Sequence, residues 1–168
     1  MNGEIFKTIP DFQNYSVSTL GNVRNDLNGL ILKQGNDKDG YKKVSLNRNK
    51  KSTSQRVHRL VAKTYLPNYY NLPLVDHRNR TVDDNRLINL RWCNYSQNQQ
   101  NAMKKPNGTS KHKGVHFHKR EKLWMAYIWI KKHIHLGQFL TEDEAKKARD
   151  KFIIDNRMEK FYSQDLEL

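Results

Sequence analysis

Cysteine and long apolar segments are what this sequence most lacks. Its 168 residues include a single cysteine, Cys93. This excludes an internal disulfide framework and zinc modules built on several cysteines, and it fits a reducing compartment. No apolar run approaches the roughly 20 residues that span a bilayer, and residues 1–11 lack the basic-then-apolar pattern of an export signal. We therefore expect an intracellular protein with no membrane partner.

Acidic residues are also scarce. The chain has 17 Asp and Glu against 31 Lys and Arg, a formal net charge of +14. Between Asp84 and Glu142 the only acid is Glu121, whereas eleven Lys or Arg residues fall in the same stretch. An excess of this size favours a nucleic-acid partner over a merely solvated basic face. A membrane surface fits less well, because the basic residues do not share one amphipathic helix.

The residues that are present can build a folded protein. Hydrophobic residues make up 36% and aromatic residues 10% of the chain, which is enough to bury a core. Local patterns predict strands over residues 15–23 and 42–46 and a short helix over 57–65 that ends before Pro67. Extended runs at 72–75 and 90–93, followed by the polar segment 94–103, predict a strand, loop, strand, helix unit.

A linker separates this part from a second predicted domain. Charged, small polar, Pro and Gly residues gather between residues 101 and 111, and we place the linker at 105–110. Three strands are predicted beyond it, at 114–118, 124–130 and 133–139. A helix follows, opened by a capping box of Thr141 and Glu144 and ending near Asn156. Side chains alternate across a strand, so the helix would cover an aliphatic face and leave histidines and aromatic residues on the other.

Polar residues suited to phosphodiester chemistry lie in the strand, loop, strand, helix unit. Hydrolysis of a phosphodiester needs a base that activates water and a hard divalent ion that stabilises charge on the phosphate. Asp76 and Asn98 offer the oxygen ligands that Mg²⁺ prefers, and His77 has a side chain that titrates near neutral pH. Adjacent strand residues point to opposite faces, so one site for Asp76 and His77 requires the strand to twist or end there.

The order of these residues resembles that of the HNH endonucleases, which have a ββα-metal fold. The resemblance rests on Asp76-His77, Asn85, Asn89-Leu90-Arg91-Trp92, Asn98 and Asn101. It implies that His77 is the general base, that Asp76 and Asn98 bind Mg²⁺ or Mn²⁺, and that Asn89 pins the loop and orients the base. Many family members have a metal-binding His at the position of Asn98. Asn at this position is similar to the motif of phage intron-encoded homing endonucleases, including nicking ones. Residues 56–62 continue the resemblance, and within them we expect His58 to be structural.

The first fifty residues resemble a small module that precedes HNH domains in homing endonucleases. Tyr15-Ser16-Val17-Ser18, Gly21-Asn22-Val23-Arg24 and Asp39-Gly40-Tyr41 carry this resemblance. It implies an antiparallel β module that helps to hold DNA through phosphate contacts. The expected contacts are Arg24, Lys33, Lys42 and Lys43, although a purely solvated side chain is an equal alternative for each lysine.

The last third of the chain resembles the APETALA2-type DNA-binding domain of plant transcription factors. Ser110–Val115, Trp124–Ile128, Leu136–Phe139 and Glu144-Ala145 carry this resemblance. It implies that the free face of a three-stranded sheet enters the major groove. The expected DNA contacts are Lys113, His116, His118, Arg120, Tyr127, Trp129, Lys131, His133 and His135.

The histidines depart from that family, because its plant members mostly have arginines at such positions. A neutral histidine cannot make the bidentate hydrogen bonds that arginine makes to guanine. One alternative is a zinc site built from the His-x-His pairs; another is that the histidines are simply exposed. If they lie against phosphates, DNA binding should tighten as the pH falls from about 8 toward about 6.

Together these features predict an α+β protein in three functional parts. The predicted boundaries are an N-terminal β module at 1–52, a ββα-metal nuclease core at 53–104, the linker at 105–110 and the DNA-binding domain at 111–160. The expected function is metal-dependent, homing-type cleavage of double-stranded DNA, by nicking of one strand. We expect no small-molecule substrate and a monomer, with a dimer as the alternative, acting in the host cytoplasm or nucleoid if phage-encoded. The main alternative function is a non-catalytic DNA-binding regulator; RNA binding is a third, which the groove-reading sheet disfavours.

Overall fold

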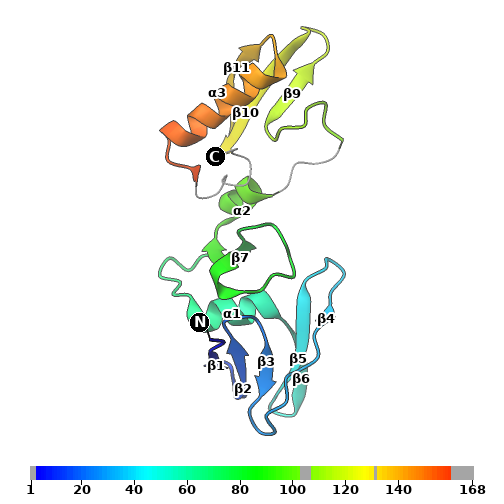
Figure 1. The fold of residues 1–168 in the computed structure, drawn as a ribbon, viewed down its shortest axis with the longest axis vertical. Coiled ribbons are helices and arrows are strands. Elements are labelled where there is room, and N and C mark those ends of the chain that lie inside the picture. Colours follow the sequence, from blue (N-terminus) through cyan, green and yellow to red (C-terminus); the bar gives the residue numbers. More distant parts are fainter. Residues whose placement is uncertain (1–2, 103–106, 131, 160–168) are drawn as a thin grey trace. The chain divides into compact units, whose positions relative to one another are not determined.

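The described residues form small antiparallel sheets and three α-helices, arranged in two compact units (Figure 1). The computed structural model describes residues 3–102, 107–130 and 132–159. The units are Met1–Asn94 and Tyr95–Leu168. Within the described ranges, no helix has the length and apolar character needed to cross a membrane.

The first unit contains three sheets and one helix. The first sheet is formed by β1 (Phe6–Ile9), β2 (Phe12–Ser18) and β3 (Val23–Asn25). The second is formed by β4 (Gly35–Asn36), β5 (Lys42–Arg48) and β6 (Lys51–Arg56). The third is the ribbon of β7 (Leu74–His77) and β8 (Leu90–Cys93), preceded by a 3₁₀ turn at Leu87–Asn89. Helix α1 (Val57–Tyr65) contacts strands of all three sheets.

One hydrophobic core holds the first unit together. It includes Val17 of β2, Leu46 of β5 and Val61 of α1, all fully buried, and extends to Val75 and Leu90 of the third sheet. The predicted N-terminal module and the predicted catalytic strands therefore share a core, because α1 places apolar side chains against both. The boundary at residue 52 does not separate two cores, and the compact unit ends at Asn94.

The single strand predicted over residues 15–23 is wrong. β2 ends at Ser18 and β3 begins at Val23, with a tight turn between them. The Ser18 hydroxyl accepts hydrogen bonds from the backbone N–H groups of Leu20 and Asn22, which competes with a continued strand. Gly21 has a φ of +88°, a conformation that glycine adopts at low cost.

The second unit consists of a short helix, a three-stranded sheet and a longer helix. Its elements are α2 (Tyr95–Asn101), β9 (Val115–His118), β10 (Leu123–Ile130), β11 (Lys132–Phe139) and α3 (Glu142–Asp155). β10 lies between the other two strands, antiparallel to both. The predicted capping box of Thr141 and Glu144 is confirmed.

Helix α3 covers the aliphatic face of the sheet, as the alternation of side chains predicts. Ile128 and Ile153 form one small buried cluster, and Val115, Ala126 and Ala145 form another. The predicted DNA contact Lys131, residues 105–106 of the predicted linker and residue 160 of the predicted domain lie outside the described residues.

Candidate active site and nucleic-acid interface

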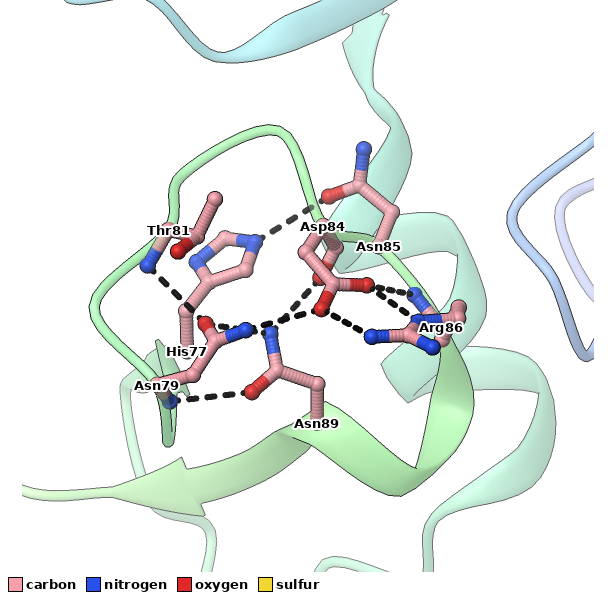
Figure 2. A network of polar contacts seen from close by, with 7 residues as sticks. All are labelled: His77, Asn79, Thr81, Asp84, Asn85, Arg86 and Asn89. Carbon is pink, nitrogen blue, oxygen red and sulfur yellow. Dashed lines mark hydrogen bonds and ion pairs between the residues drawn. The ribbon is translucent and has the colours of Figure 1, made fainter.

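His77 is the last residue of β7 and lies in a polar network (Figure 2). Its side chain is buried, and its Nε2 lies 3.1 Å from Oδ1 of Asn85. Because an amide oxygen only accepts hydrogen bonds, this contact assigns the proton to Nε2 and the lone pair to Nδ1. Burial lowers the pKa of His77, against the opposing effects of the Asn85 hydrogen bond and the Asp76 charge. The ring is therefore neutral at neutral pH, the state that the predicted role of general base requires.

Asn89 pins the loop that follows His77. Its Nδ2 donates to Oδ1 of Asn79 at 2.9 Å and to the backbone oxygen of Asp84 at 2.8 Å, while its Oδ1 accepts from the Asn79 backbone N–H (Figure 2). The hydrogen bond from Arg86 holds the pKa of Asp84 at about 2, so their ion pair persists well below neutral pH. Asn89 thus joins two parts of this loop, whereas the side chain bonded directly to His77 is Asn85.

Asp76 lies next to His77 in the chain but has a different partner. Arg91, its cross-strand neighbour on β8, places Nε at 2.9 Å and Nη2 at 2.8 Å from Asp76 Oδ2. Both side chains are buried. Adjacent residues of a regular strand point to opposite faces, so a shared site for Asp76 and His77 requires the strand to twist or end there. β7 does end at His77. Arg91 stands in the recognised motif, yet its sequence context gave no hint of this ion pair.

The donors assigned to a metal are a carboxylate and an amide. Asp76 sits on β7, and Asn98 sits on α2, at the start of the second unit. Carboxylate and amide oxygens are hard ligands that suit Mg²⁺ or Mn²⁺, and so small a protein set leaves coordination positions for water and phosphate oxygens. The types of donor therefore fit the expected ion.

Two aromatic side chains that the sequence analysis did not place beside His77 pack against it. The ring centroid of His58, on α1, lies 5.0 Å from that of His77, and the Tyr41 centroid lies 6.0 Å away. Tyr41 and His58 are themselves 4.9 Å apart. These contacts join residues far apart in the chain, so no local pattern could have indicated them.

The other face of the second unit's sheet carries the expected row of rings. His116 stacks on Tyr127 with 5.1 Å between centroids, His135 lies 4.9 Å from Tyr127, and His133 lies 4.7 Å from Trp129. A hollow of about 540 Å³ opens beside them, lined in part by His112, His116 and His133. Among the described residues, no group of three or more His, Cys, Asp or Glu is placed to hold a metal ion.

The remaining predicted DNA contacts have varied surroundings. Lys33 and Arg120 are exposed, and Lys42 and Lys43 are half-buried. Arg24 pairs with Asp26 at 2.8 Å and covers the Phe6 ring. The Nδ1 atom of His118 lies 3.8 Å from Oε2 of Glu121. The Lys113 ammonium donates to the backbone oxygens of Gln99, Gln100 and Ala102 at the end of α2, a structural role that the sequence did not indicate.

Comparison with known proteins finds similarity to nucleases. Residues 4–47 match the NUMOD4 motif. The chain is 36% identical over 98 residues to the uncharacterized HNH endonuclease L245 of Acanthamoeba polyphaga mimivirus, a match that covers 58% of this chain and 29% of that protein. It is 37% identical over 89 residues to the DNA endonuclease I-HmuI of Bacillus phage SP01, covering 53% and 51% of the two chains.

The fold agrees with the sequence match. A solved structure concerned with DNA binding and cleavage by the HNH homing endonuclease I-HmuI superposes with a TM-score of 0.54 at 35% identity, over 58% of this chain and 56% of that one. The matches thus span about half of I-HmuI or less than a third of the mimivirus protein. The chain therefore carries a NUMOD4 motif and is homologous, over more than half of its length, to HNH endonucleases.

Proposed function

We propose that this protein is a metal-dependent HNH endonuclease that hydrolyses DNA phosphodiester bonds and nicks one strand at a recognised site. The observation that carries the proposal is His77: a buried, neutral imidazole at a strand end, bonded through Nε2 to Asn85 and followed by a loop that Asn89 pins. Homology to HNH endonucleases, one of which is named a DNA endonuclease, supports it.

In this proposal the Nδ1 atom of His77 takes a proton from the attacking water. Asn85 Oδ1 accepts from the Nε2 hydrogen both before and after this transfer, so the ring gains a proton without losing its hydrogen bond. Asp76 and Asn98 would hold the divalent cation, and Arg91 fixes the Asp76 carboxylate. When bound, the cation neutralises charge on the phosphate and on the leaving 3′ oxygen.

We further propose that double-stranded DNA is held by the flanking parts of the chain. The ring-lined sheet face of the second unit would lie in the major groove in an APETALA2-type manner, with the exposed side chains of His116, His133 and His135 toward DNA. Lys33, Lys42 and Lys43 would contact phosphates from the N-terminal part. One such active site cuts one strand at a time, so the proposed monomer nicks.

The test is a plasmid assay. Supercoiled DNA containing the flanking sequence of the protein's own gene is incubated with Mg²⁺, with Mn²⁺ or with chelator, and wild type is compared with His77→Asn. Open circles that require the metal and disappear in the variant, while gel-shift affinity is unchanged, support a nickase with His77 as its base. Linear product in place of open circles contradicts the nicking of one strand.

The buried ion pair of Asp76 and Arg91 favours one other candidate function. This ion pair compensates the charge of the buried Asp76 carboxylate without a metal ion. That is expected of a DNA-binding regulator in which the nuclease fold has only a structural role. Both candidates neutralise phosphates and lose affinity with added salt, so affinity cannot distinguish them. Folded protein that binds DNA but never breaks a strand with Mg²⁺ or Mn²⁺ would establish the regulator.

A further inference from the structure

The ring of His77 is enclosed by two aromatic side chains from outside the catalytic motif. His58 is 4% exposed, and its ring meets that of His77 edge-on, at an interplanar angle of 64°. Tyr41 packs against His58 at 4.9 Å and lies 6.0 Å from His77. Tyr41, which directly precedes β5, belongs to the segment that matches the NUMOD4 motif.

Ring packing, rather than hydrogen bonding, determines how His58 lies. Its Nδ1 is buried and has no hydrogen-bond partner among the described residues. Desolvation by burial, together with the nearby His77, Arg56 and Arg59, lowers the pKa of His58 to about 3. His58 therefore presents an uncharged ring to His77 throughout the working pH range.

Tyr41 is fixed in turn by the segment around it. The Arg56 guanidinium lies over the Tyr41 ring, 4.5 Å from its centroid. Arg56 forms ion pairs with Asp37 at 2.6 Å and Asp39 at 3.0 Å. The Tyr41 backbone N–H donates to Asp37 Oδ1. The turn before β5 thus holds one side of the enclosure in place.

A general base needs such an enclosure, because the torsion that sets the plane of an imidazole has broad minima. The hydrogen bond to Asn85 restrains one atom of the ring. A base held loosely loses most of its catalytic advantage. Contacts with two further rings add restraint on the plane of the ring.

We propose that His58 and Tyr41 are positioning residues, an aromatic wall that holds the His77 imidazole in the orientation that bonds Asn85. The inference rests on the proposed function for its effect on rate, but its structural part can be measured without any nuclease activity. The ring, not the nitrogen, is the feature that acts, so phenylalanine should replace either residue.

The full-length protein tests this with His58→Phe, His58→Ala, Tyr41→Phe and Tyr41→Ala. The ¹⁵N shifts of the His77 ring, identified by their loss in His77→Asn, are recorded near pH 8, where histidine is neutral. Both phenylalanine variants should keep the Nε2–H tautomer, whereas both alanine variants should give a mixture of tautomers. In nicking assays the alanine variants should lose about tenfold or more in kcat with KM within about twofold, and the phenylalanine variants should stay within about threefold of wild type.

Val17→Ala is the control, because Val17 is fully buried in the same core but takes no part in these ring contacts. It should lower stability while keeping the tautomer and kcat. Folded alanine variants that keep one tautomer and a wild-type kcat would overturn the inference, as would phenylalanine variants that fail to restore them. If wild type never nicks DNA, the proposed function fails, but the tautomer result still decides whether the wall positions His77.

Discussion

At the scale of single residues, Asn85 is the side chain on which the state of His77 most directly depends. Its Oδ1 bonds the ring nitrogen at 3.1 Å, and the amide is buried. In Asn85→Ala the His77 proton can move between ring nitrogens and the ring can turn. We expect the nicking rate to fall about 10- to 100-fold, because general-base catalysis contributes about 10²- to 10⁴-fold, with unchanged DNA affinity in a gel shift.

Asn68→Ala is the matched control for Asn85. Asn68 also pins a loop, by bonds to both the backbone N–H and the backbone oxygen of Leu72, but it makes none of these contacts with His77. Equal loss of rate in the two variants would mean that Asn85 merely stabilises the loop.

His58 predicts how stability responds to acid. Its pKa is about 3 in the folded protein against 6.5 ordinarily, so the unfolded chain binds the proton more readily. The stability associated with neutral His58 is present above about pH 6.5 and is lost as the pH falls toward 3. Chemical denaturation at several pH values should show that His58→Phe loses about 2–4 kcal/mol less than wild type over this window, since one pKa unit corresponds to about 1.4 kcal/mol. Parallel curves for the two proteins would contradict this.

At the scale of secondary-structure elements, local patterns predicted most strands and helices correctly. β8, β10 and α3 lie where hydrophobic alternation or capping residues indicated them. The turn at residues 19–22 escaped prediction because the Ser18 hydroxyl, not a Pro or an Asn-Gly pair, ends the strand. Hydrogen bonds of a side chain to its own backbone leave little mark on the hydrophobic pattern.

The end of α2 depends on one lysine. α2 has 7 residues, and a helix this short is marginal without help from its surroundings. The Lys113 ammonium donates to the carbonyls of Gln99 and Gln100 in α2 and to that of Ala102, directly after the helix, and it complements the helix dipole. Lys113→Met should lower hydrogen-exchange protection of the α2 amides by the equivalent of about 1–2 kcal/mol. Lys119→Met, which removes an equal charge from an exposed position, should leave that protection unchanged.

The turn between β2 and β3 lies against Asn85, the hydrogen-bond partner of His77. A Cβ atom on Gly21 would lie 2.9 Å from Asn85 Cβ and 3.2 Å from its backbone oxygen, and the φ of +88° already disfavours alanine. Gly21→Ala should therefore lower stability by about 1–3 kcal/mol and reduce the nicking rate by displacing Asn85. Gly29→Ala shares a positive φ of +73° but has no atom within 4 Å of the added methyl, so it should lower stability alone.

At the scale of the whole molecule, the net charge of +14 predicts strongly salt-dependent DNA binding. Affinity should fall with added salt with a log–log slope of about −0.9 for each phosphate neutralised. If the histidines of the ring-lined face lie near phosphates, affinity at constant ionic strength should rise severalfold between about pH 8 and about pH 6. Fluorescence anisotropy on the full chain should show this rise in wild type and its loss when His116, His133 and His135 are replaced by Gln. A pH-independent affinity would remove these histidines from the interface.

The candidate site was only partly predictable from sequence. His77, Asp76 and Asn89 were identified because their types and spacing are specific to a known chemistry. Arg91, Asn85 and His58 acquire their roles from cross-strand and long-range contacts, and spacing along the chain does not encode which side chains meet across a core. The sequence thus predicted which residues would carry out the proposed chemistry, and the folded chain adds the contacts that surround them.

The shared core of the first unit has a consequence for how such proteins are assembled in evolution and in the laboratory. Recombination that exchanges residues 1–52 for another N-terminal segment would remove Tyr41 from beside His77 and Gly21 from beside Asn85, even though the catalytic motif itself stayed intact. A crossover at that point should yield chimeras that express poorly or cut slowly. We therefore expect that an exchange preserving these contacts has to move residues 1–94 as one piece.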